Sequence, residues 1–424
     1  MRKRKFKFID LFAGIGGFHQ AMNKFGECVF AAEIDQYAIE TYKENYGIDA
    51  CYDVTKIDPA TIPDHDFLCA GFPCQAFSKA GQRLGFKDQN KGTLFFQICK
   101  ILEHHQTNYF ILENVRNLAS HDKGRTWATI SNSLKKLGYV INEEPIIISP
   151  HHLGIPQLRE RVVIIGIHKS LGIKKINVQL PNKTSNKISF LDSQILETNV
   201  DPKYYISELE EKIITCWDQF IKGIKYVPMI KVNKQTKTKK YFKAKYQGVL
   251  GFPVWVSEFR KTDDYSNVKY EWKKNFIAKN RYFYQYNKKF IDKWLKKWND
   301  LNDFPLSKRK LEWQCGTSCQ SLWDGLIQFR PSGVRVKAPT LFPALVAMVQ
   351  IPIIGKVKRK LTPREAARLQ SFPDWFKINP NDHQAYKQFG NAVNVEVITY
   401  IIEQLLQHIK NKNINNNSSI QTSK

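Results

Sequence analysis

No apolar run in this sequence approaches the roughly 20 residues that a helix needs to cross a bilayer, so we expect no membrane partner. The basic N-terminus, MRKRKFKFIDLF, lacks the long apolar core and the small-residue cleavage site of a signal peptide. The eight cysteines are scattered along 424 residues, which is typical of reduced thiols in a cytosol. Together these absences favour a cytoplasmic protein.

A metal-binding pattern is also missing. Cys315 and Cys319 lie close together in the chain, but no second cysteine pair or histidine cluster accompanies them. Zinc sites normally draw four ligands from two such groups. We therefore expect no metal.

Acidic residues are scarce: 39 Asp and Glu stand against 65 Lys and Arg, which gives a net charge of +26. An excess of positive charge this large destabilises the folded chain by self-repulsion. Proteins with such an excess usually bind a polyanion such as a nucleic acid. A basic surface without a dedicated partner is the alternative.

Short apolar runs alternate with helical patterns over the first 170 residues. The helical patterns cover residues 17–26, 36–46, 92–104 and 126–137. The strand candidates read KFIDLF, CVFAAEI, HDFLCAG, NYFILEN, PIIISP and RVVIIGI. This alternation predicts the α/β class, with a doubly wound, mainly parallel sheet.

The residue composition changes along the rest of the chain. Residues 1–189 form the first part of the α/β domain, ending in a linker from about residue 170. Residues 190–350 form a smaller inserted domain, in which lysines alternate with aromatic residues in KGIKYVPMIKVNKQTKTKKYFKAKYQG. Lysines neutralise a nucleic-acid backbone, and aromatic rings contact bases or sugars. Residues 351–410 return to the first domain, and the Asn-rich tail 411–424 is predicted to be disordered.

A glycine-rich turn follows the first strand candidate. In FIDLFAGIGGF, Asp10 ends the strand, and Gly14, Gly16 and Gly17 occupy the turn. This pattern differs from the G-x-G-x-x-G that seats a pyrophosphate. An acidic residue before the turn better suits a cationic ligand. Glu33 is suitably placed for ribose hydroxyls and Asp53 for an adenine amino group, so the three acidic residues together predict S-adenosylmethionine.

The stretch GFPCQAFS places Cys74 just beyond a strand, at the carboxyl edge of the sheet where such folds bind ligands. A thiolate there is a nucleophile. Glu113 ends another strand at the same edge. In IPQLRERVVIIG, Arg159 and Arg161 alternate at a strand start and are predicted to share one face with Gln157. Taken singly, each has a structural explanation: an inert thiol, a helix cap, a solvated strand start.

Methylation of cytosine at C5 requires this set of groups. A thiolate that adds to C6 makes C5 nucleophilic, and a carboxyl group with a raised pKa assists by hydrogen bonding to N3. An arginine on O2 stabilises the developing charge. Because a paired base is inaccessible in a duplex, the base must be flipped out.

These stretches closely resemble the bacterial DNA (cytosine-5)-methyltransferases of restriction-modification systems. The motifs that carry the resemblance lie in residues 7–168 and 360–400: DLFAGIGGF, GFPCQAFS, GTLFFQI, ENVRNL, QLRERVVIIG, LTPREAARLQSFPD and YKQFGNAV. The resemblance implies that Cys74 is the nucleophile and that Glu113 contacts the N3 and amino edge of cytosine. It implies that Arg159 and Arg161 hold the active-site loop and the cytosine O2.

Further site residues follow from the same resemblance. The implied cofactor contacts are Phe12, Gly14, Gly16, Glu33, Asp53, Val54, Pro73, Leu94, Asn391 and Val393. Residues 190–350 correspond by position to the target-recognition domain. The implied DNA contacts are Ser78, Lys79 and Arg83 in the loop after Cys74, and Arg330, Arg335, Lys337 and Thr340 in FRPSGVRVKAPT.

The resulting hypothesis is a sequence-specific DNA cytosine-5 methyltransferase that acts on double-stranded DNA as a monomer, beside a restriction endonuclease of the same specificity. Two alternatives stay open at this point. One is an RNA cytosine-5 methyltransferase, and the other is a basic nucleic-acid-binding module that has kept a cofactor fold without activity.

Overall fold

The computed structural model describes residues 5–73, 93–181, 189–232, 239–345 and 350–421 of the chain. These residues form two compact units. Unit 1 comprises Met1–Leu196, Pro343–Val349 and Pro363–Lys424, and unit 2 comprises Glu197–Phe342 and Gln350–Thr362. Among the described residues, no helix is long and apolar enough to cross a membrane.

Unit 1 is built on a seven-stranded sheet in the order β2-β1-β3-β4-β8-β5, with β6 also paired to β8. The neighbours β2, β1, β3 and β4 are parallel, and β8 runs antiparallel to β4, β5 and β6. One reversed strand in a sheet of otherwise common direction confirms the predicted doubly wound, mainly parallel class. The strands are β1 (Phe6–Leu11), β2 (Gly26–Ala32), β3 (Phe67–Gly71), β4 (Tyr109–Val115), β5 (Tyr139–Ile141), β6 (Ile146–Ile148) and β8 (Arg161–His168), and the two-residue β7 (Gln157–Leu158) precedes β8.

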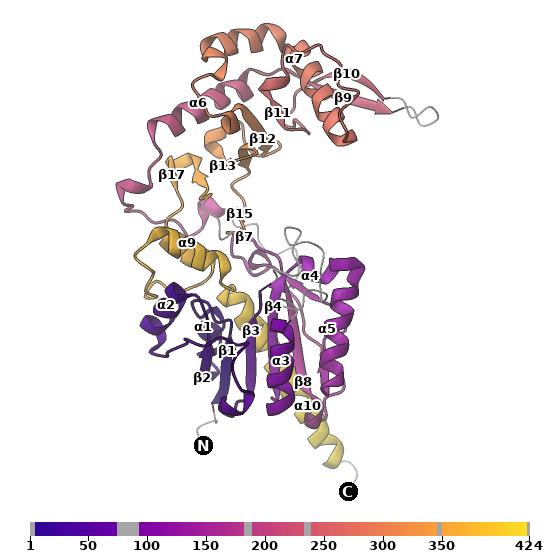
Figure 1. Ribbon diagram of the computed structural model, residues 1–424, viewed down its shortest axis with the longest axis vertical. Helices are drawn as coiled ribbons and strands as arrows, with labels where there is room; N and C mark the ends of the chain where they lie inside the picture. The colour runs from indigo at the N-terminus through magenta and orange to yellow at the C-terminus, as the bar shows by residue number, and fades with distance from the viewer. Residues whose placement is uncertain (1–4, 74–92, 182–188, 233–238, 346–349, 422–424) are drawn as a thin grey trace. The chain divides into compact units, whose positions relative to one another are not determined.

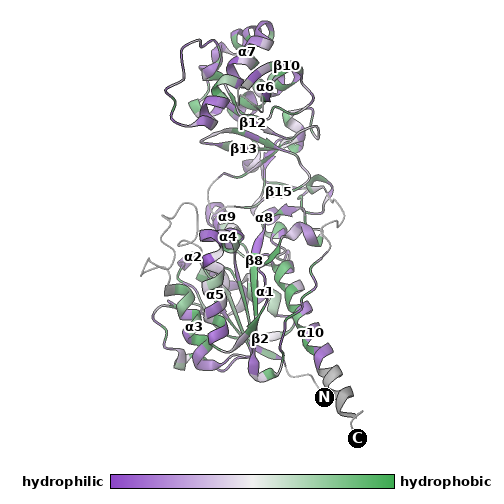
Figure 2. Ribbon diagram, turned by 90° about the vertical axis from the view of Figure 1, so that its right-hand side faces the viewer, coloured by the Kyte–Doolittle hydropathy of each residue, from purple (hydrophilic) through white to green (hydrophobic). Residues whose placement is uncertain are grey.

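Helices cover both faces of this sheet: in Figure 2, α3 and α5 lie on one side of the strands, and α1 and α10 lie on the other. The central strands β3 and β4 are buried along nearly their whole length because both faces are covered. The helices are α1 (Gly17–Met22), α2 (Gln36–Tyr46), α3 (Thr93–His105), α4 (Asn117–Ser120), α5 (Arg125–Lys136), α8 (Pro363–Leu369), α9 (Asp382–Asn391) and α10 (Val395–Gln421).

Unit 2 has its own sheet and its own core. Its six-stranded sheet has the order β11-β12-β14-β13-β16-β17, and the two-stranded ribbon β9–β10 stands apart from that sheet in pairing. The elements are α6 (Glu208–Gly223), β9 (Tyr226–Val232), β10 (Lys239–Lys245), β11 (Val254–Trp255), α7 (Glu271–Lys297), β12 (Lys310–Gln314), β13 (Leu326–Arg330), β14 (Gly333–Lys337), β16 (Ile353–Ile354) and β17 (Arg359–Lys360).

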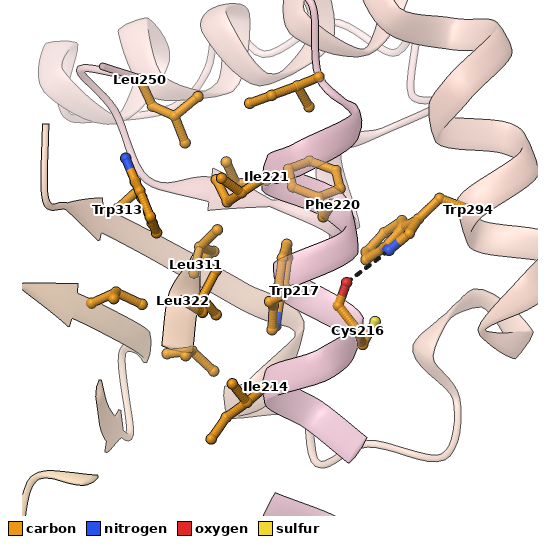
Figure 3. Close-up of a cluster of buried hydrophobic side chains, with 14 of the residues drawn as sticks. Ile214, Cys216, Trp217, Phe220, Ile221, Leu250, Trp294, Leu311, Trp313 and Leu322 are labelled. Carbon is orange, nitrogen blue, oxygen red and sulfur yellow. Dashed lines mark hydrogen bonds between the residues drawn. The ribbon is translucent and has the colours of Figure 1, made fainter. Parts of the chain in front are cut away.

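The core of unit 2 is rich in aromatic side chains (Figure 3). Trp217 of α6 is fully buried, and its indole N–H donates to the carbonyl of Lys308 at 2.9 Å. Trp294 of α7 donates in the same way to the carbonyl of Cys216 at 3.0 Å. Since both indole N–H groups are satisfied, Trp217 and Trp294 are core residues, and they join α6 to α7 and to the segment before β12.

The structure draws the unit boundaries differently from the sequence expectation at three places. Residues 351–362, expected to belong to the return into the first domain, lie in unit 2 because β16 pairs with β13 and β17 pairs with β16. The first boundary falls at Leu196/Glu197 rather than at 189/190, and β15 (Phe342–Pro343) marks a second crossing. The tail from residue 411 was expected to be disordered, but α10 continues to Gln421, since no Pro or Gly interrupts it after Val395.

Candidate active site

A cavity of about 560 Å³ opens at the carboxyl ends of the parallel strands of unit 1. The chain leaves β1 to form β2 on one side and later returns to form β3 on the other, so this edge is a topological switch point. The turn after β1 and Phe72 and Pro73 after β3 both line the cavity. The ligand site therefore lies where the strand order predicts it.

The turn after β1 needs glycine at two positions. Gly14 and Gly16 have φ values of +55° and +83°, in the left-handed region that favours glycine. A Cβ on Gly16 would lie 2.3 Å from Cε2 of Tyr46, whereas a Cβ on Gly14 would meet no atom within 4 Å. Gly17 meets Val393, whose Cγ2 and carbonyl oxygen would lie 2.7 and 2.8 Å from a Cβ there. The glycines thus shape the turn and allow the C-terminal segment to approach it closely.

Glu33 follows β2 and lines the cavity with its carboxylate fixed by backbone donors. Its Oε2 accepts from the amide of Gly14 at 2.7 Å, and its Oε1 accepts from the amides of Ile34 and Asp35 at 2.8 and 2.9 Å. A carboxylate has about four lone-pair sites, so acceptor capacity is left for a ligand hydroxyl. The side chain is preorganised for the hydroxyl-binding role that the sequence predicts.

Asp53 lines the same cavity and is oriented by its own turn. Its Oδ1 accepts from the hydroxyl of Thr55 at 2.7 Å and from the amide of Thr55 at 2.9 Å. These hydrogen bonds lower the pKa of Asp53, so the carboxylate is ionised and can accept from an amino group.

Asp10 and Gly16 do not line the cavity, although the sequence grouped them with the cofactor residues. Asp10 is completely buried behind the turn, where its Oδ2 accepts from the amide of His19 at 3.3 Å. Burial raises the pKa of Asp10 well above its ordinary value. Its place in the structure is beneath the glycine turn rather than against a ligand.

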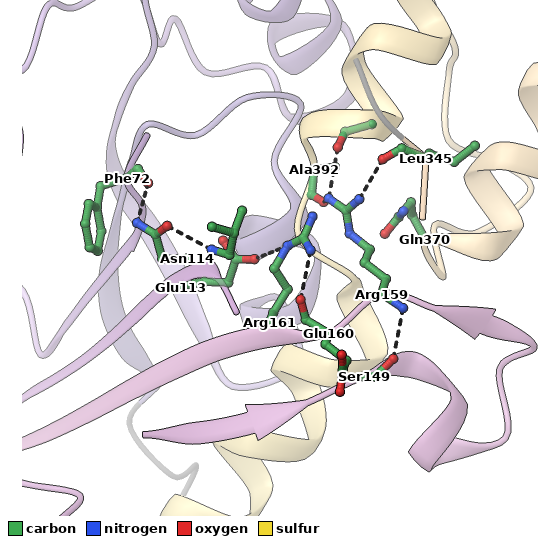
Figure 4. A network of polar contacts seen from close by, with 12 residues as sticks. Phe72, Glu113, Asn114, Ser149, Arg159, Glu160, Arg161, Leu345, Gln370 and Ala392 are labelled. Carbon is green, nitrogen blue, oxygen red and sulfur yellow. Dashed lines mark hydrogen bonds and ion pairs between the residues drawn. The ribbon is translucent and has the colours of Figure 1, made fainter. Parts of the chain in front are cut away.

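Glu113 reaches the cavity from the end of β4 and pairs with Arg161 at the start of β8 (Figure 4). The Nε of Arg161 lies 2.9 Å from Oε1 of Glu113, in a pair of neighbouring antiparallel strands. Burial raises the pKa of Glu113, while Arg161 and Arg159 oppose that rise. A raised pKa favours the protonated form of the carboxyl group, and that form can donate a hydrogen bond.

Arg159 and Arg161 both line the cavity, but they do not share one face of a strand as the sequence predicted. β7 ends at Leu158 and β8 begins at Arg161, so Arg159 lies between strands and the rule of alternating faces does not apply. The Arg159 side chain is buried and donates to the carbonyls of Leu345, Gly390 and Ala392 at 2.8–3.0 Å. Arg159 lines the cavity but is held mainly by the C-terminal segments.

Further cavity residues were missed from the sequence. They come from β-strand ends and from the segment around α9: Ile34, Asp35, Tyr52, Gly71, Phe72, Asn114, Val115, Leu345, Lys387, Gln388, Gly390 and Ala392. Asn114 carried a signal in the ENV motif. It is buried beside Glu113 and donates from Nδ2 to the carbonyl of Phe72 at 3.0 Å, which ties the end of β4 to the segment before Cys74.

The predicted site residues other than Asp10 and Gly16 fall into three groups by their place in the structure. Those found in the cavity are Phe12, Gly14, Gly17, Glu33, Asp53, Val54, Pro73, Leu94, Glu113, Arg159, Arg161, Asn391 and Val393. Those outside the described residues are Cys74, Ser78, Lys79 and Arg83. Those in or just after the sheet of unit 2 are Arg330, Arg335, Lys337 and Thr340. Within the part of the chain that the structure describes, no group of His, Cys, Asp or Glu is arranged to hold a metal ion.

The predicted DNA contacts of unit 2 gather on one face of its sheet. Arg335 and Lys337 alternate along β14, and Arg330 on β13 lies opposite Gly333 of the same face. Arg335 donates from Nε to Glu312 of β12 at 2.6 Å. Burial lowers the pKa of Lys337, and the charges of Arg335 and Arg330 lower it further. The three cations are therefore close enough to share one anionic partner.

The sequence profile described as C-5 cytosine-specific DNA methylase matches residues 6–407 of this chain. The chain is 35% identical to Type II methyltransferase M1.ScrFI of Lactococcus lactis subsp. cremoris, over 95% of this chain and 78% of the relative. It is 34% identical to Type II methyltransferase M.HpaII of Haemophilus parainfluenzae, over 96% and 91% of the two chains.

Solved structures show the same fold at lower identity. The Entamoeba histolytica methyltransferase EhMeth is 17% identical and superposes with a TM-score of 0.54, covering 96% of this chain and 99% of its own. The S. pombe Dnmt2 methyltransferase is 18% identical and superposes with a TM-score of 0.50, covering 95% and 99%.

Proposed function

This chain belongs to the C-5 cytosine-specific DNA methylase family, and from that membership and the cavity of unit 1 we propose that it methylates one cytosine within a specific sequence of double-stranded DNA, using S-adenosylmethionine. DNA cytosine-5 methyltransferase activity is common to the family and its named relatives. The observation that carries the finer proposal is that the Glu113–Arg161 pair and the Gly14–Glu33 turn open into the same cavity.

The residues of the cavity fit S-adenosylmethionine. Glu33 has acceptor capacity for ribose hydroxyls, and Asp53 is an ionised acceptor for the adenine amino group. Phe12, Leu94 and Val393 supply apolar walls, as small-molecule sites generally require. When bound, S-adenosylmethionine supplies an electrophilic methyl group on a sulfonium sulfur.

Chemistry on the base rests on Cys74, Glu113 and the two arginines. Pro73 lines the cavity, so the chain enters the reactive loop at the cavity wall. We propose that the Cys74 thiolate adds to C6 of a flipped cytosine while the protonated Glu113 donates to N3. C5 then takes the methyl group, and loss of the C5 proton allows the thiolate to leave C6, which restores the aromatic ring.

The arginines have separable parts in this proposal. Arg161 holds Glu113 in place and is near enough to act on the cytosine O2 as charge develops. Arg159 ties the cavity to the C-terminal segments through three carbonyls. DNA is held by the cationic face of Arg330, Arg335 and Lys337 in unit 2, together with Thr340 and the loop residues Ser78, Lys79 and Arg83.

The names of the relatives support a restriction-modification role, in which a restriction endonuclease of the same specificity is the functional partner. The protein is proposed to act as a monomer on DNA, since one chain carries both the cavity and the cationic face.

The direct test is incubation with S-adenosylmethionine and bacterial DNA, followed by mapping of 5-methylcytosine. Methylation at one position of a short motif is expected. Cys74→Ser should abolish turnover while DNA and cofactor binding persist, and DNA with 5-fluorocytosine at the target should form a covalent adduct with the wild-type protein only. Methylation of matched tRNA in place of DNA would transfer the activity to RNA, and full activity of Cys74→Ser would remove the nucleophile from the proposal.

A further inference from the structure

The two strands of the β9–β10 ribbon carry cations without acidic neighbours along the ribbon. Residues 225–246 contain eight lysines and no Asp or Glu. On one face, Lys240 of β10 lies directly opposite Lys231 of β9. Both are exposed, and neither forms an ion pair with an acidic side chain within the described residues. Like charges directly opposite each other destabilise a strand pair, so this arrangement costs stability in the free protein.

An uncovered apolar pair lies next to those lysines on the same face. Phe242 is opposite Met229, two positions along each strand from Lys240 and Lys231. Phe242 and Met229 are 46% and 49% exposed, although the next pair on this face, Ala244 and Val227, packs into the core of unit 2. Along this face, the pair that packs into the core is followed by the exposed pair Met229 and Phe242, here called the apolar step, and then by the two lysines.

The opposite face of the ribbon is already occupied. Tyr241 stacks on Tyr282 of α7 with ring centroids 4.7 Å apart. The ammonium of Lys243 lies 3.8 Å from the centre of the Tyr226 ring. The ribbon packs beside α7 within unit 2 (Figure 1). The side chains of Lys231, Met229, Lys240 and Phe242 on its other face are exposed.

We propose that this face of the β9–β10 ribbon is a second DNA-contacting surface, separate from the face with Arg335 and independent of DNA sequence. Lys231 and Lys240 neutralise phosphates, and Met229 and Phe242 pack against the sugars and base edges of the adjoining groove. Apolar side chains flanked by cations are used in this way by proteins that enter DNA grooves. Met229 and Phe242 cannot hydrogen-bond to a base edge, and Lys231 and Lys240 are assigned to phosphates, so the surface adds affinity rather than specificity.

Charge decides between the occupants of this surface. A second copy of this chain would bring a net charge of +26 toward the same lysines, so self-association through the ribbon is disfavoured. Duplex DNA satisfies both the cations and the apolar step, and the inference rests on the proposed action on DNA. An anionic membrane surface is the competing chemistry, and the test includes it.

The test is the salt dependence of DNA binding by the full-length double variant Lys231→Gln/Lys240→Gln. Removing one lysine–phosphate interaction should reduce the slope of log K against log salt by about 0.9, so a decrease approaching about 1.8 is expected for two. Because the substitutions remove a like-charge pair, the melting temperature should stay the same or rise. Lys135→Gln/Lys136→Gln at the exposed end of α5 makes the same charge change in unit 1 and is the matched control.

The apolar step is tested by Met229→Ala/Phe242→Ala, which should weaken DNA binding without changing the salt slope. If the wild-type protein methylates DNA but the salt slope of DNA binding by Lys231→Gln/Lys240→Gln equals that of the control variant, the ribbon proposal alone is overturned. If Lys231→Gln/Lys240→Gln loses binding to vesicles containing phosphatidylserine but keeps its DNA binding, the ribbon proposal is also overturned, and the ribbon is assigned to a membrane surface. A wild-type protein that neither binds nor methylates DNA would instead remove the proposed function.

Discussion

Alanine substitutions at Gly14 and Gly16 should separate the stability of unit 1 from its ability to bind a cofactor. At Gly16, a left-handed φ of +83° costs about 1–2 kcal/mol for alanine. The new Cβ would also lie 2.3 Å from the Tyr46 ring. That ring stacks on His19 at 3.9 Å and donates its hydroxyl to the Gly16 carbonyl, so it has little room to move. Overpacking of this kind adds about 1–3 kcal/mol.

The sum for Gly16→Ala is about 2–5 kcal/mol, and a unit of this size loses about 2–4 °C in Tm per kcal/mol, so Tm should fall by about 4–20 °C. Gly14→Ala has the backbone term alone, because its Cβ meets nothing within 4 Å, and its Tm should fall by only about 2–8 °C. Since Gly14 lines the cavity, its methyl group takes up ligand space, and the Kd for S-adenosylmethionine should rise about 5- to 150-fold.

Differential scanning calorimetry gives the Tm values, and isothermal titration of S-adenosylmethionine well below each Tm gives the affinities. The two variants should rank oppositely in Tm and in affinity: Gly16→Ala is the less stable variant, and Gly14→Ala binds S-adenosylmethionine more weakly. Equal losses of Tm would show that Tyr46 does not confine Gly16. Unchanged affinity in Gly14→Ala would show that the cofactor does not approach this turn.

Three further predictions concern the Glu113–Arg161 pair and Arg159. Glu113→Gln should lower methyl transfer about 10²- to 10⁴-fold with cofactor binding retained, as measured by single-turnover kinetics. Because burial raises the pKa of Glu113 and the reactive form is protonated, wild-type turnover should fall as pH rises through that pKa. Arg161→Met removes a charge that lowers this pKa, so the basic limb of the pH profile should move to higher pH, and an unmoved limb would exclude Glu113 as its source. Arg159→Met strands three carbonyls and should lower Tm more than Arg161→Met, with a loss of about 3–5 kcal/mol by chemical denaturation; the reverse order of Tm would contradict the assignment of Arg159 to the C-terminal segments.

The α/β unit could be predicted from the sequence because its strands are buried on both faces and read as continuous apolar runs. All six strand candidates overlap a strand of the sheet. The strand that was missed, β5, has only three residues, Tyr139–Ile141, too few to show a pattern. The helical pattern at 17–26 stops at Met22 because β2 already begins at Gly26.

The sheet of unit 2 could not be predicted in the same way. Its strands have two to five residues, and some of their partners are distant in sequence: β11 pairs with β12, and β13 pairs with β16. Strands this short carry no periodic signal, and their identity depends on tertiary pairing. Trp217 and Trp294 of this region belong to its core, as their burial and their hydrogen bonds show.

The cavity illustrates the same limit at the level of single residues. Motifs located Glu33 and Glu113 because each ends a strand, and the carboxyl ends of parallel strands meet at one edge. The expected sharing of one strand face by Arg159 and Arg161 was wrong, because the alternation of side chains holds only inside a continuous strand and β7 ends at Leu158 whereas β8 begins at Arg161. Lys387, Gln388 and Gly390 belong to the same YKQFGNAV motif as the expected contacts Asn391 and Val393, but which further residues of that motif line the cavity depends on how α9 packs.

The Arg159 side chain links parts of the cavity wall that lie far apart in the sequence because unit 2 is inserted between them. A buried guanidinium without a carboxylate has a high desolvation cost, and here burial lowers the pKa of Arg159 well below its usual range. Three carbonyls offset that cost, one 186 residues away and two 231 and 233 residues away in the chain. Leu345 lies in the segment Pro343–Val349, and Gly390 and Ala392 lie at the C-terminal end of α9 within Pro363–Lys424, the two segments of unit 1 that follow parts of unit 2. The side chain therefore fastens both segments to the cavity wall, so the cavity is completed by residues from both sides of the inserted unit.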